Sequence, residues 1–138
     1  MMFQNTRYNR QEAIPLLGKK GQDKLSASSI AVIGAGGVKS PILFYLVAAG
    51  VGKIRIIDFD SVEMSNLNRQ ILYSERDVGR NKAEAAAERL LGINSEITIE
   101  PVIDRVSFDN FAVFDEDYID TWVITPRMRE IWVNHDVR

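Results

Sequence analysis

The chain has 138 residues, of which 26% are charged and 46% hydrophobic, and its formal net charge is -2. This length fits one domain with a sizeable core, while the pI of about 5.4 and the lack of a long basic stripe argue against a general nucleic-acid binder. No apolar run approaches membrane-spanning length and the N-terminus lacks an apolar signal core, so we expect a cytoplasmic protein without membrane contact.

Residues 1–27 are predicted to form an N-terminal arm that carries the sequence RYNRQ at 7–11 and a short helix around Gly21 to Leu25. Residues 28–138 are predicted to form one α/β domain, a Rossmann-like, mostly parallel sheet with flanking helices. Its first strand is expected at 29–33, because a short β-branched, apolar run is typical of a strand buried on both faces of a parallel sheet.

A glycine-rich turn follows this strand at once. Gly34, Gly36 and Gly37 permit a tight turn that brings backbone N–H groups close to a ligand. The apolar stretch 38–49, closed by Gly50, is predicted to be a buried helix whose N-terminus is an anion site. Strand, turn and helix together predict a phosphate cradle, and the alternative is a glycine turn that serves packing alone.

The second strand is expected at 53–58 and ends in Asp58. Dinucleotide-binding folds place an acid there, about twenty residues after the glycine turn, to accept hydrogen bonds from ribose hydroxyls. Asp58 is therefore the candidate ribose ligand. An NAD-dependent oxidoreductase would share every feature up to this point.

An irregular loop is expected from Asp58 to residue 80, and it carries an unusual polar set. Asn66, Arg69, Gln70 and Lys82 all fall within this one crossover connection. Arginine binds phosphate through a bidentate fork and lysine as a compact point charge, so the set suits a polyphosphate. The alternative is that Arg69 and Lys82 are ordinary solvated surface residues.

The rest of the chain continues the α/β pattern. The expected elements are a helix at 82–91 ended by Gly92, a strand through Ile97, Ile99 and Pro101, a short helix from Ser107 to Phe114, and a fourth strand at 118–124 stopped by Pro126. The tail from Arg127 to Arg138 has an apolar helical face that covers its own core or, alternatively, docks on a partner.

Six short sequences recur here as a set: RYNRQ at 7–11, GAGG at 34–37, AAGVG at 48–52, DFD at 58–60, SNLNRQ at 65–70 and VGRNK at 78–82. With them the chain resembles the N-terminal half of the adenylation domain of the MoeB/ThiF family, relatives of ubiquitin-activating enzymes. The resemblance implies an adenylyltransferase that uses ATP on the C-terminal glycine of a ubiquitin-like protein such as a sulfur carrier. The products are an acyl-adenylate and pyrophosphate.

The resemblance also implies roles for individual residues. Gly37, with Gly34 and Gly36, lies against the phosphates, and Asp58 binds the ribose. Asn66, Arg69 and Lys82 contact the triphosphate. Arg10 reaches into the site of a neighbouring subunit, which implies a homodimer or a heterodimer. The expected catalytic residues are thus Arg10, Arg69 and Lys82. The alternative for Arg10 is an ordinary surface arginine without a catalytic role.

Two departures from the family pattern stand out. Lys39 occupies the place of a third glycine, so its side chain is expected to point outward or to shift the helix; it either adds positive charge to the phosphate site or is a plain surface lysine. The family's D-x-x-D-N pattern, which holds magnesium, is replaced by Val123-Ile124-Thr125-Pro126-Arg127. Mg2+ remains an expected cofactor with no ligand identified, since Asp117 and Asp120 fall several residues early.

The chain has no cysteine, which excludes a cysteine-ligated zinc site, a thioester nucleophile and a disulfide. It is also shorter than the full family domain. Together with the missing magnesium ligand, this keeps open a second function, a non-catalytic scaffold subunit of a heterodimeric ubiquitin-like activating enzyme. An NAD-dependent oxidoreductase has no use for the SNLNRQ and VGRNK sequences. The pathway, whether thiamine, molybdopterin or tRNA thiolation, is not indicated.

Overall fold

The computed structural model describes residues 7–107, 109–110 and 119–124. A four-stranded parallel sheet in the order β3-β2-β1-β4 forms its centre. The strands are β1 (Ser29–Ile33), β2 (Lys53–Ile57), β3 (Thr98–Val102) and β4 (Thr121–Val123). The predicted α/β fold with a parallel sheet is therefore confirmed.

The two inner strands are buried and mostly apolar, although β2 also contains the buried Arg55, which pairs with Glu100 of β3. Ala31 and Val32 of β1 and Ile54 and Ile56 of β2 have no exposed surface, as expected for a parallel sheet covered on both sides. Strand β3 lies at the edge of the described sheet. That position tolerates Pro101, which has no N–H to donate to a further strand.

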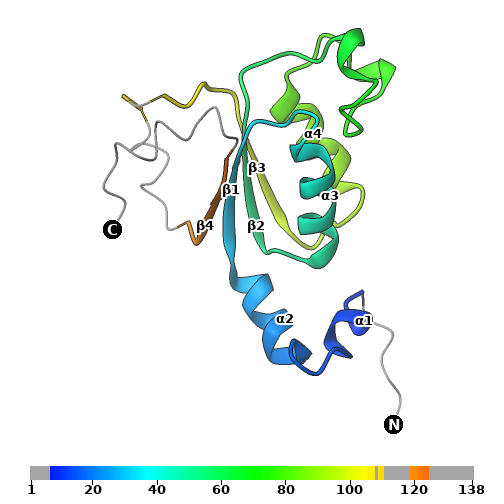
Figure 1. The fold of residues 1–138 in the computed structure, drawn as a ribbon, viewed down its shortest axis with the longest axis vertical. Helices are drawn as coiled ribbons and strands as arrows, with labels where there is room; N and C mark the ends of the chain where they lie inside the picture. Colours follow the sequence, from blue (N-terminus) through cyan, green and yellow to red (C-terminus); the bar gives the residue numbers. More distant parts are fainter. Residues whose placement is uncertain (1–6, 108, 111–118, 125–138) are drawn as a thin grey trace.

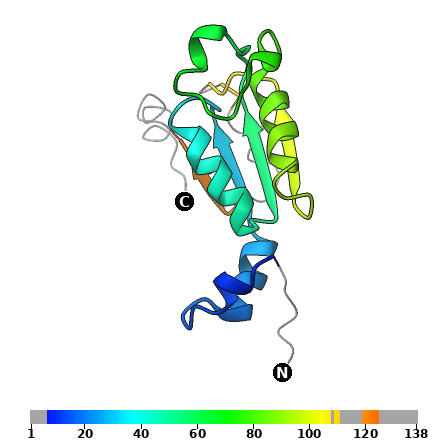
Figure 2. The same cartoon turned by 90° about the vertical axis from the view of Figure 1, so that its right-hand side faces the viewer.

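Helices α3 (Lys39–Ala49) and α4 (Lys82–Leu91) lie side by side on one face of the sheet (Figures 1 and 2). Their buried residues, among them Leu43, Val47 and Leu90, join the strands in the main hydrophobic cluster. Helix α4 has the predicted bounds, and α3 begins one residue later than predicted. Gly50 ends α3 with φ of 85°, a left-handed conformation that glycine adopts without strain.

The N-terminal arm contains more helix than the sequence predicted. Helix α1 (Asn9–Glu12) was not foreseen, and α2 (Gly18–Ala27) is longer than the segment around 21–25. Glycines at 18 and 21 obscured α2, because glycine disfavours helices unless tertiary packing compensates. Both helices lie at the amino-terminal edge of the sheet (Figure 1). The division into an arm (1–27) and a domain (28–138) stays a prediction.

The sequence RYNRQ docks this arm onto the end of α3. Tyr8 Oη accepts a hydrogen bond of 2.9 Å from Asn94 Nδ2, which also donates to the carbonyl of Val47. A Cβ on Gly50 would lie 2.5 Å from the ring of Tyr8, so only glycine fits there. Gln11 and Gln22 both donate to the carbonyl of Ala49. The arm thus covers carbonyl groups that the helix end leaves unpaired.

The carboxyl-terminal predictions are met in part. Ser107 and Asn110 lie in an irregular segment rather than a helix, with Asn110 Oδ1 accepting from the Ser107 N–H, and the rest of that predicted helix lies outside the described residues. Strand β4 is shorter than the predicted 118–124, and residue 118 is not described. The segment from Arg127 to Arg138 lies outside the described residues. The described helices include none long and apolar enough to cross a membrane.

The loop from Asp58 to residue 80 is more regular than predicted. It contains two 3₁₀ turns, Met64–Asn66 and Glu75–Asp77. Each begins with a reciprocal capping arrangement, in which the side chains of the first and fourth residues bond each other's backbone N–H groups.

Asn94→Ala is predicted to destabilise the fold by about 2 to 4 kcal/mol, because it removes a fully buried amide that donates to Tyr8 and to the Val47 carbonyl and accepts from the Glu96 N–H. Urea unfolding measures the loss. Asn68→Ala, at an exposed position, is the matched control. An equally small loss in both variants would show that the arm docks without this amide.

Candidate functional site

The glycine turn lies at the carboxyl ends of the strands, between β1 and α3. Strand β2 lies on one side of β1 and β4 on the other. The strand order therefore reverses at β1, and open α/β sheets bind ligands at such a switch point. Gly34 has φ of 86°, a conformation that a residue with a side chain rarely adopts.

Asp58 holds this turn from the end of β2. Its carboxylate accepts a hydrogen bond of 2.8 Å from the N–H of Ala35 and one of 2.9 Å from the N–H of Asp60. The side chain is 8% exposed. Asp58 therefore shapes the turn, and its predicted contact with a ribose stays a prediction.

The sequence SNLNRQ lies against the same turn. A Cβ on Gly36 would lie 3.7 Å from Nε2 of Gln70, and one on Gly37 would lie 3.5 Å from Cγ of Arg69. The structure thus places Arg69 and Gln70 beside the glycines, and their predicted contact with a polyphosphate stays a prediction. Arg69 itself is exposed, and its guanidinium donates to the carbonyl of Ser65 and to Oδ1 of Asn68.

Asn66 has a structural bond that the sequence did not indicate. Its Oδ1 accepts a hydrogen bond from the N–H of Glu63 and caps the first 3₁₀ turn. The residue is 8% exposed. The cap fixes the start of the SNLNRQ segment, and the predicted contact of Asn66 with a triphosphate stays a prediction.

Tyr73 is a residue that sequence reasoning missed. Its hydroxyl donates a hydrogen bond of 2.6 Å to the carbonyl of Ala35, and it lies 3.3 Å from the carbonyl of Lys82. It therefore ties the glycine turn to the start of α4. The signal in the sequence was weak, because Tyr73 is one of two aromatic residues in a largely polar connection, the other being Phe59. Burial, followed by the charges of Asp58 and Asp77, raises the pKa of Tyr73.

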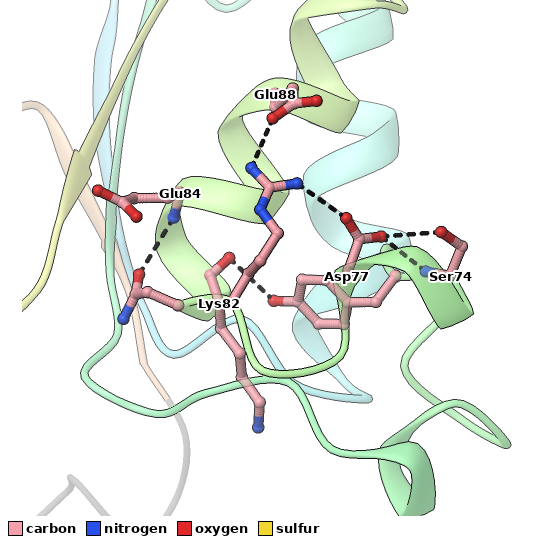
Figure 3. A network of polar contacts seen from close by, with 8 residues as sticks. Ser74, Asp77, Lys82, Glu84 and Glu88 are labelled. Atoms are coloured by element: carbon pink, nitrogen blue, oxygen red, sulfur yellow. Dashed lines mark hydrogen bonds and ion pairs between the residues drawn. The ribbon is translucent and has the colours of Figure 1, made fainter.

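Lys82 begins α4 beside a network of ion pairs. Asn81 caps the helix by accepting from the N–H of Glu84, and Arg80 bridges Asp77 and Glu88 (Figure 3). Burial by itself would raise the pKa of Asp77. Hydrogen bonds from Ser74 and the charge of Arg80 outweigh burial and lower that pKa. The Lys82 side chain points away from this network (Figure 3), and no carboxylate of the described residues pairs with it. Its positive charge is therefore available to a ligand.

Lys39 does not point outward. It is 2% exposed, and its ammonium donates a hydrogen bond of 3.2 Å to the carbonyl of Ile33 at the end of β1. The expectation of an outward side chain was wrong, and so was the alternative of a surface lysine. The side chain runs from the start of α3 toward the end of β1, where the Ile33 carbonyl accepts from its ammonium. Burial lowers the pKa of Lys39.

Two candidate residues lie far from the turn. Arg10 is exposed on α1, at the opposite end of the sheet from the glycines (Figure 1). Asp120 accepts from the N–H of Ser29 at the start of β1, so it too lies at that opposite edge. Asp117 lies outside the described residues.

The described residues do not fit a magnesium ion. Residues 7–107, 109–110 and 119–124 contain no group of three histidine, aspartate or glutamate side chains that could hold a metal. Both carboxylate oxygens of Asp58 accept backbone N–H groups. The donor set of this turn consists mainly of cations and N–H groups, which attract anions and repel metals.

Comparison with known protein families shows which family contains this chain. The model of the ThiF family matches residues 8–123. The chain belongs to the ThiF family. The sulfur carrier protein adenylyltransferase of Thermus thermophilus is 45% identical over 104 residues, which are 75% of this chain and 38% of that protein. This ThiF-family chain thus spans well under half the length of that curated relative.

Solved structures of relatives share the fold. E. coli MccB, crystallised with ATP, superposes with a TM-score of 0.79 at 34% identity over 94% of this chain and 41% of its own. E. coli TcdA, a tRNA N6-threonylcarbamoyladenosine dehydratase in complex with ATP, gives 0.74 at 37% identity over 78% of this chain and 44% of its own. Both structures therefore align with most of this chain and with less than half of their own length.

Tyr73→Phe is predicted to make stability less sensitive to alkaline pH. The folded protein keeps the Tyr73 proton where the unfolded chain loses it, so this stabilisation is complete below the ordinary pKa of 10.0 and declines as the pH rises above it. Urea unfolding above that pH should show a decline of about 1.4 kcal/mol per pH unit that the variant lacks.

Tyr45→Phe, at a tyrosine that is 78% exposed, is the control and should keep the pH dependence of the wild type. At neutral pH, Tyr73→Phe should cost about 1 kcal/mol for the lost hydrogen bond. Parallel alkaline curves for wild type and Tyr73→Phe would contradict this account of Tyr73.

Proposed function

We propose that this chain performs the ATP-dependent adenylation of the C-terminal glycine of a ubiquitin-like or sulfur-carrier protein. The observation that supports this most is the contact of Arg69 and Gln70 with Gly37 and Gly36 at the switch point of the sheet. A plain dinucleotide site does not need an arginine packed beside its glycines.

The proposed reaction is a substitution at phosphorus. A carboxylate oxygen of the terminal glycine attacks the α-phosphorus of ATP, an acyl–phosphate bond forms, and the bond to the β-phosphate oxygen breaks to release pyrophosphate. Negative charge grows on the leaving group. Cations placed beforehand next to that charge stabilise the transition state without reorganisation.

Each residue at the turn has a proposed part in this step. Gly34, Gly36 and Gly37 let backbone N–H groups approach the phosphates, and the N-terminus of α3 adds its positive dipole end. Arg69 and Lys82 bind the triphosphate and the departing pyrophosphate. Asp58 accepts from the ribose with lone pairs that its two backbone bonds leave over, and Asn66 positions the segment that carries Arg69. No step is assigned to magnesium, because the described residues offer it no fitting ligands.

Arg10 is proposed to act on the site of a second subunit. Helix α3 is about 16 Å long and separates the arm from the glycine turn, so Arg10 cannot reach the turn of its own chain. The docked arm leaves Arg10 exposed and holds its neighbours firmly. In the proposed dimer, the arm of each subunit reaches the glycine turn of the other, so that Arg10 contacts the nucleotide bound there.

A second candidate is a non-catalytic subunit that contributes Arg10 and a scaffold to an active partner. The observation that favours it is the absence, in the described part of the chain, of any carboxylate group suited to magnesium. Such a subunit binds nucleotide weakly or not at all, and it forms no acyl-adenylate alone.

Arg69→Ala is predicted to weaken ATP binding about tenfold or more, the cost of one charge-assisted hydrogen bond. Isothermal titration calorimetry measures this. Arg76→Ala removes an exposed arginine of the same connection and is the matched control. Exchange of labelled pyrophosphate into ATP, dependent on a carrier ending in glycine, tests the chemistry. Binding without exchange would favour the scaffold subunit, and absence of binding would refute the catalytic proposal.

Mixing Arg10→Ala with Lys82→Ala is predicted to restore exchange that each variant lacks alone. If Arg10 acts in trans, random mixing gives about a quarter of the wild-type rate, because half of the dimers are mixed and each has one complete site. Sedimentation measures the dimer directly. Mixtures that stay as inactive as the separate variants would show that Arg10 does not serve a neighbouring site.

A further inference from the structure

Lys39 occupies an unusual position in the glycine pattern. In the sequence G-x-G-x-x-G of dinucleotide folds, the third glycine allows close packing of helix on strand. Here the first two places are Gly34 and Gly36, and the third is Lys39, the first residue of α3. Its side chain is 2% exposed and donates to the carbonyl of Ile33.

The direction of that carbonyl locates the ammonium. The N–H of Gly34 donates to the carbonyl of Ile57 in β2. The Ile33 carbonyl belongs to the same trans peptide unit and points the opposite way. Since β4 is the neighbour of β1 on that side, the ammonium lies at the end of β1 on the side of β4, at the switch point of the sheet.

This ammonium has unused capacity to bind. A lysine has three N–H donors, and the Ile33 carbonyl is the one acceptor that the described residues give it. No described carboxylate pairs with it, because Asp58 bonds the N–H groups of Ala35 and Asp60 instead. A buried cation with one neutral partner is costly, and an anion bound beside it removes that cost.

Gln70 is a second, independent indication of a ligand at this turn. It is 6% exposed, and its Oε1 is buried without a hydrogen-bond partner, the one such side-chain atom in the described part of the chain. Its amide packs on Gly36. Buried polar atoms of native proteins are nearly always bonded, so both sides of the glycine turn carry polar groups with bonds still to make.

We propose that Lys39 is a built-in cation of the nucleotide site, which binds the phosphates of ATP and makes nucleotide binding largely independent of a divalent metal. The inference rests on the proposed nucleotide site. It accounts for two departures together: a lysine in place of glycine, and a described donor set that does not fit magnesium. One internal positive charge takes over part of the neutralisation that a metal ion gives elsewhere.

Calorimetry with ATP, in EDTA and in excess magnesium, tests the inference on the whole chain. In EDTA, Lys39→Met is expected to weaken binding about tenfold to a hundredfold, the effect of one charge-assisted bond. Wild-type affinity should differ little between the two conditions. Lys39→Gly serves as a second neutral variant that cannot block the site. Lys20→Met, with the same change of charge at an exposed position on α2, is the matched control.

Thermal unfolding of the same variants separates binding from folding. Removal of a poorly paired buried charge should leave the melting temperature of Lys39→Met unchanged or raised. If both neutral variants bind ATP in EDTA as tightly as the wild type, the proposed role of Lys39 is overturned, while the proposed function stands. The role would also be overturned if Lys39→Met lowers the melting temperature and loses the same amount of ATP affinity in EDTA and in magnesium. That result would indicate a structural lysine. Wild type that binds no ATP in either condition would overturn the proposed function itself.

Discussion

The site depends on how Ala35 is held. This buried residue lies in the middle of the glycine turn, its N–H bonded to the carboxylate of Asp58 and its carbonyl to the hydroxyl of Tyr73. The two bonds link β1, β2 and the start of α4 at one point. These bonds hold the backbone of Ala35 on both sides, which preorganises the glycine turn for the proposed site.

The two ends of the sheet have different tasks. At the amino-terminal edge, the RYNRQ sequence closes the end of α3 through Tyr8, Gln11 and the buried amide of Asn94. At the carboxyl edge, the cationic residues Lys39, Arg69 and Lys82 lie near the glycine turn. The RYNRQ motif thus performs a structural task. Its exposed members are Arg7, which pairs with Glu96 and the Ile93 carbonyl, and Arg10.

The arrangement of charged side chains at the carboxyl edge of the sheet lowers the stability of the fold. The carboxylates near the turn are engaged, Asp58 by backbone N–H groups and Asp77 by Arg80 and Ser74. Lys39 and Lys82 have no such described carboxylate partner. Buried or half-buried cations without counter-ions weaken a fold, and functional sites are where proteins retain such groups. This excess of positive charge is the basis of the polyphosphate site proposed above.

The sequence by itself determined the α/β class, helix α4, the inner strands and the glycine turn, because each follows from local periodicity and glycine conformation. It also grouped Arg69 and Gln70 with the glycines, since one crossover connection keeps them near. The bond from Tyr73 to Ala35 and the burial of Lys39 were decided by tertiary structure. The first joins residues of two different connections, and the second depends on how α3 packs against the sheet, so no local pattern encodes either. The cap made by Asn66 is a local bond to Glu63 that the sequence analysis missed.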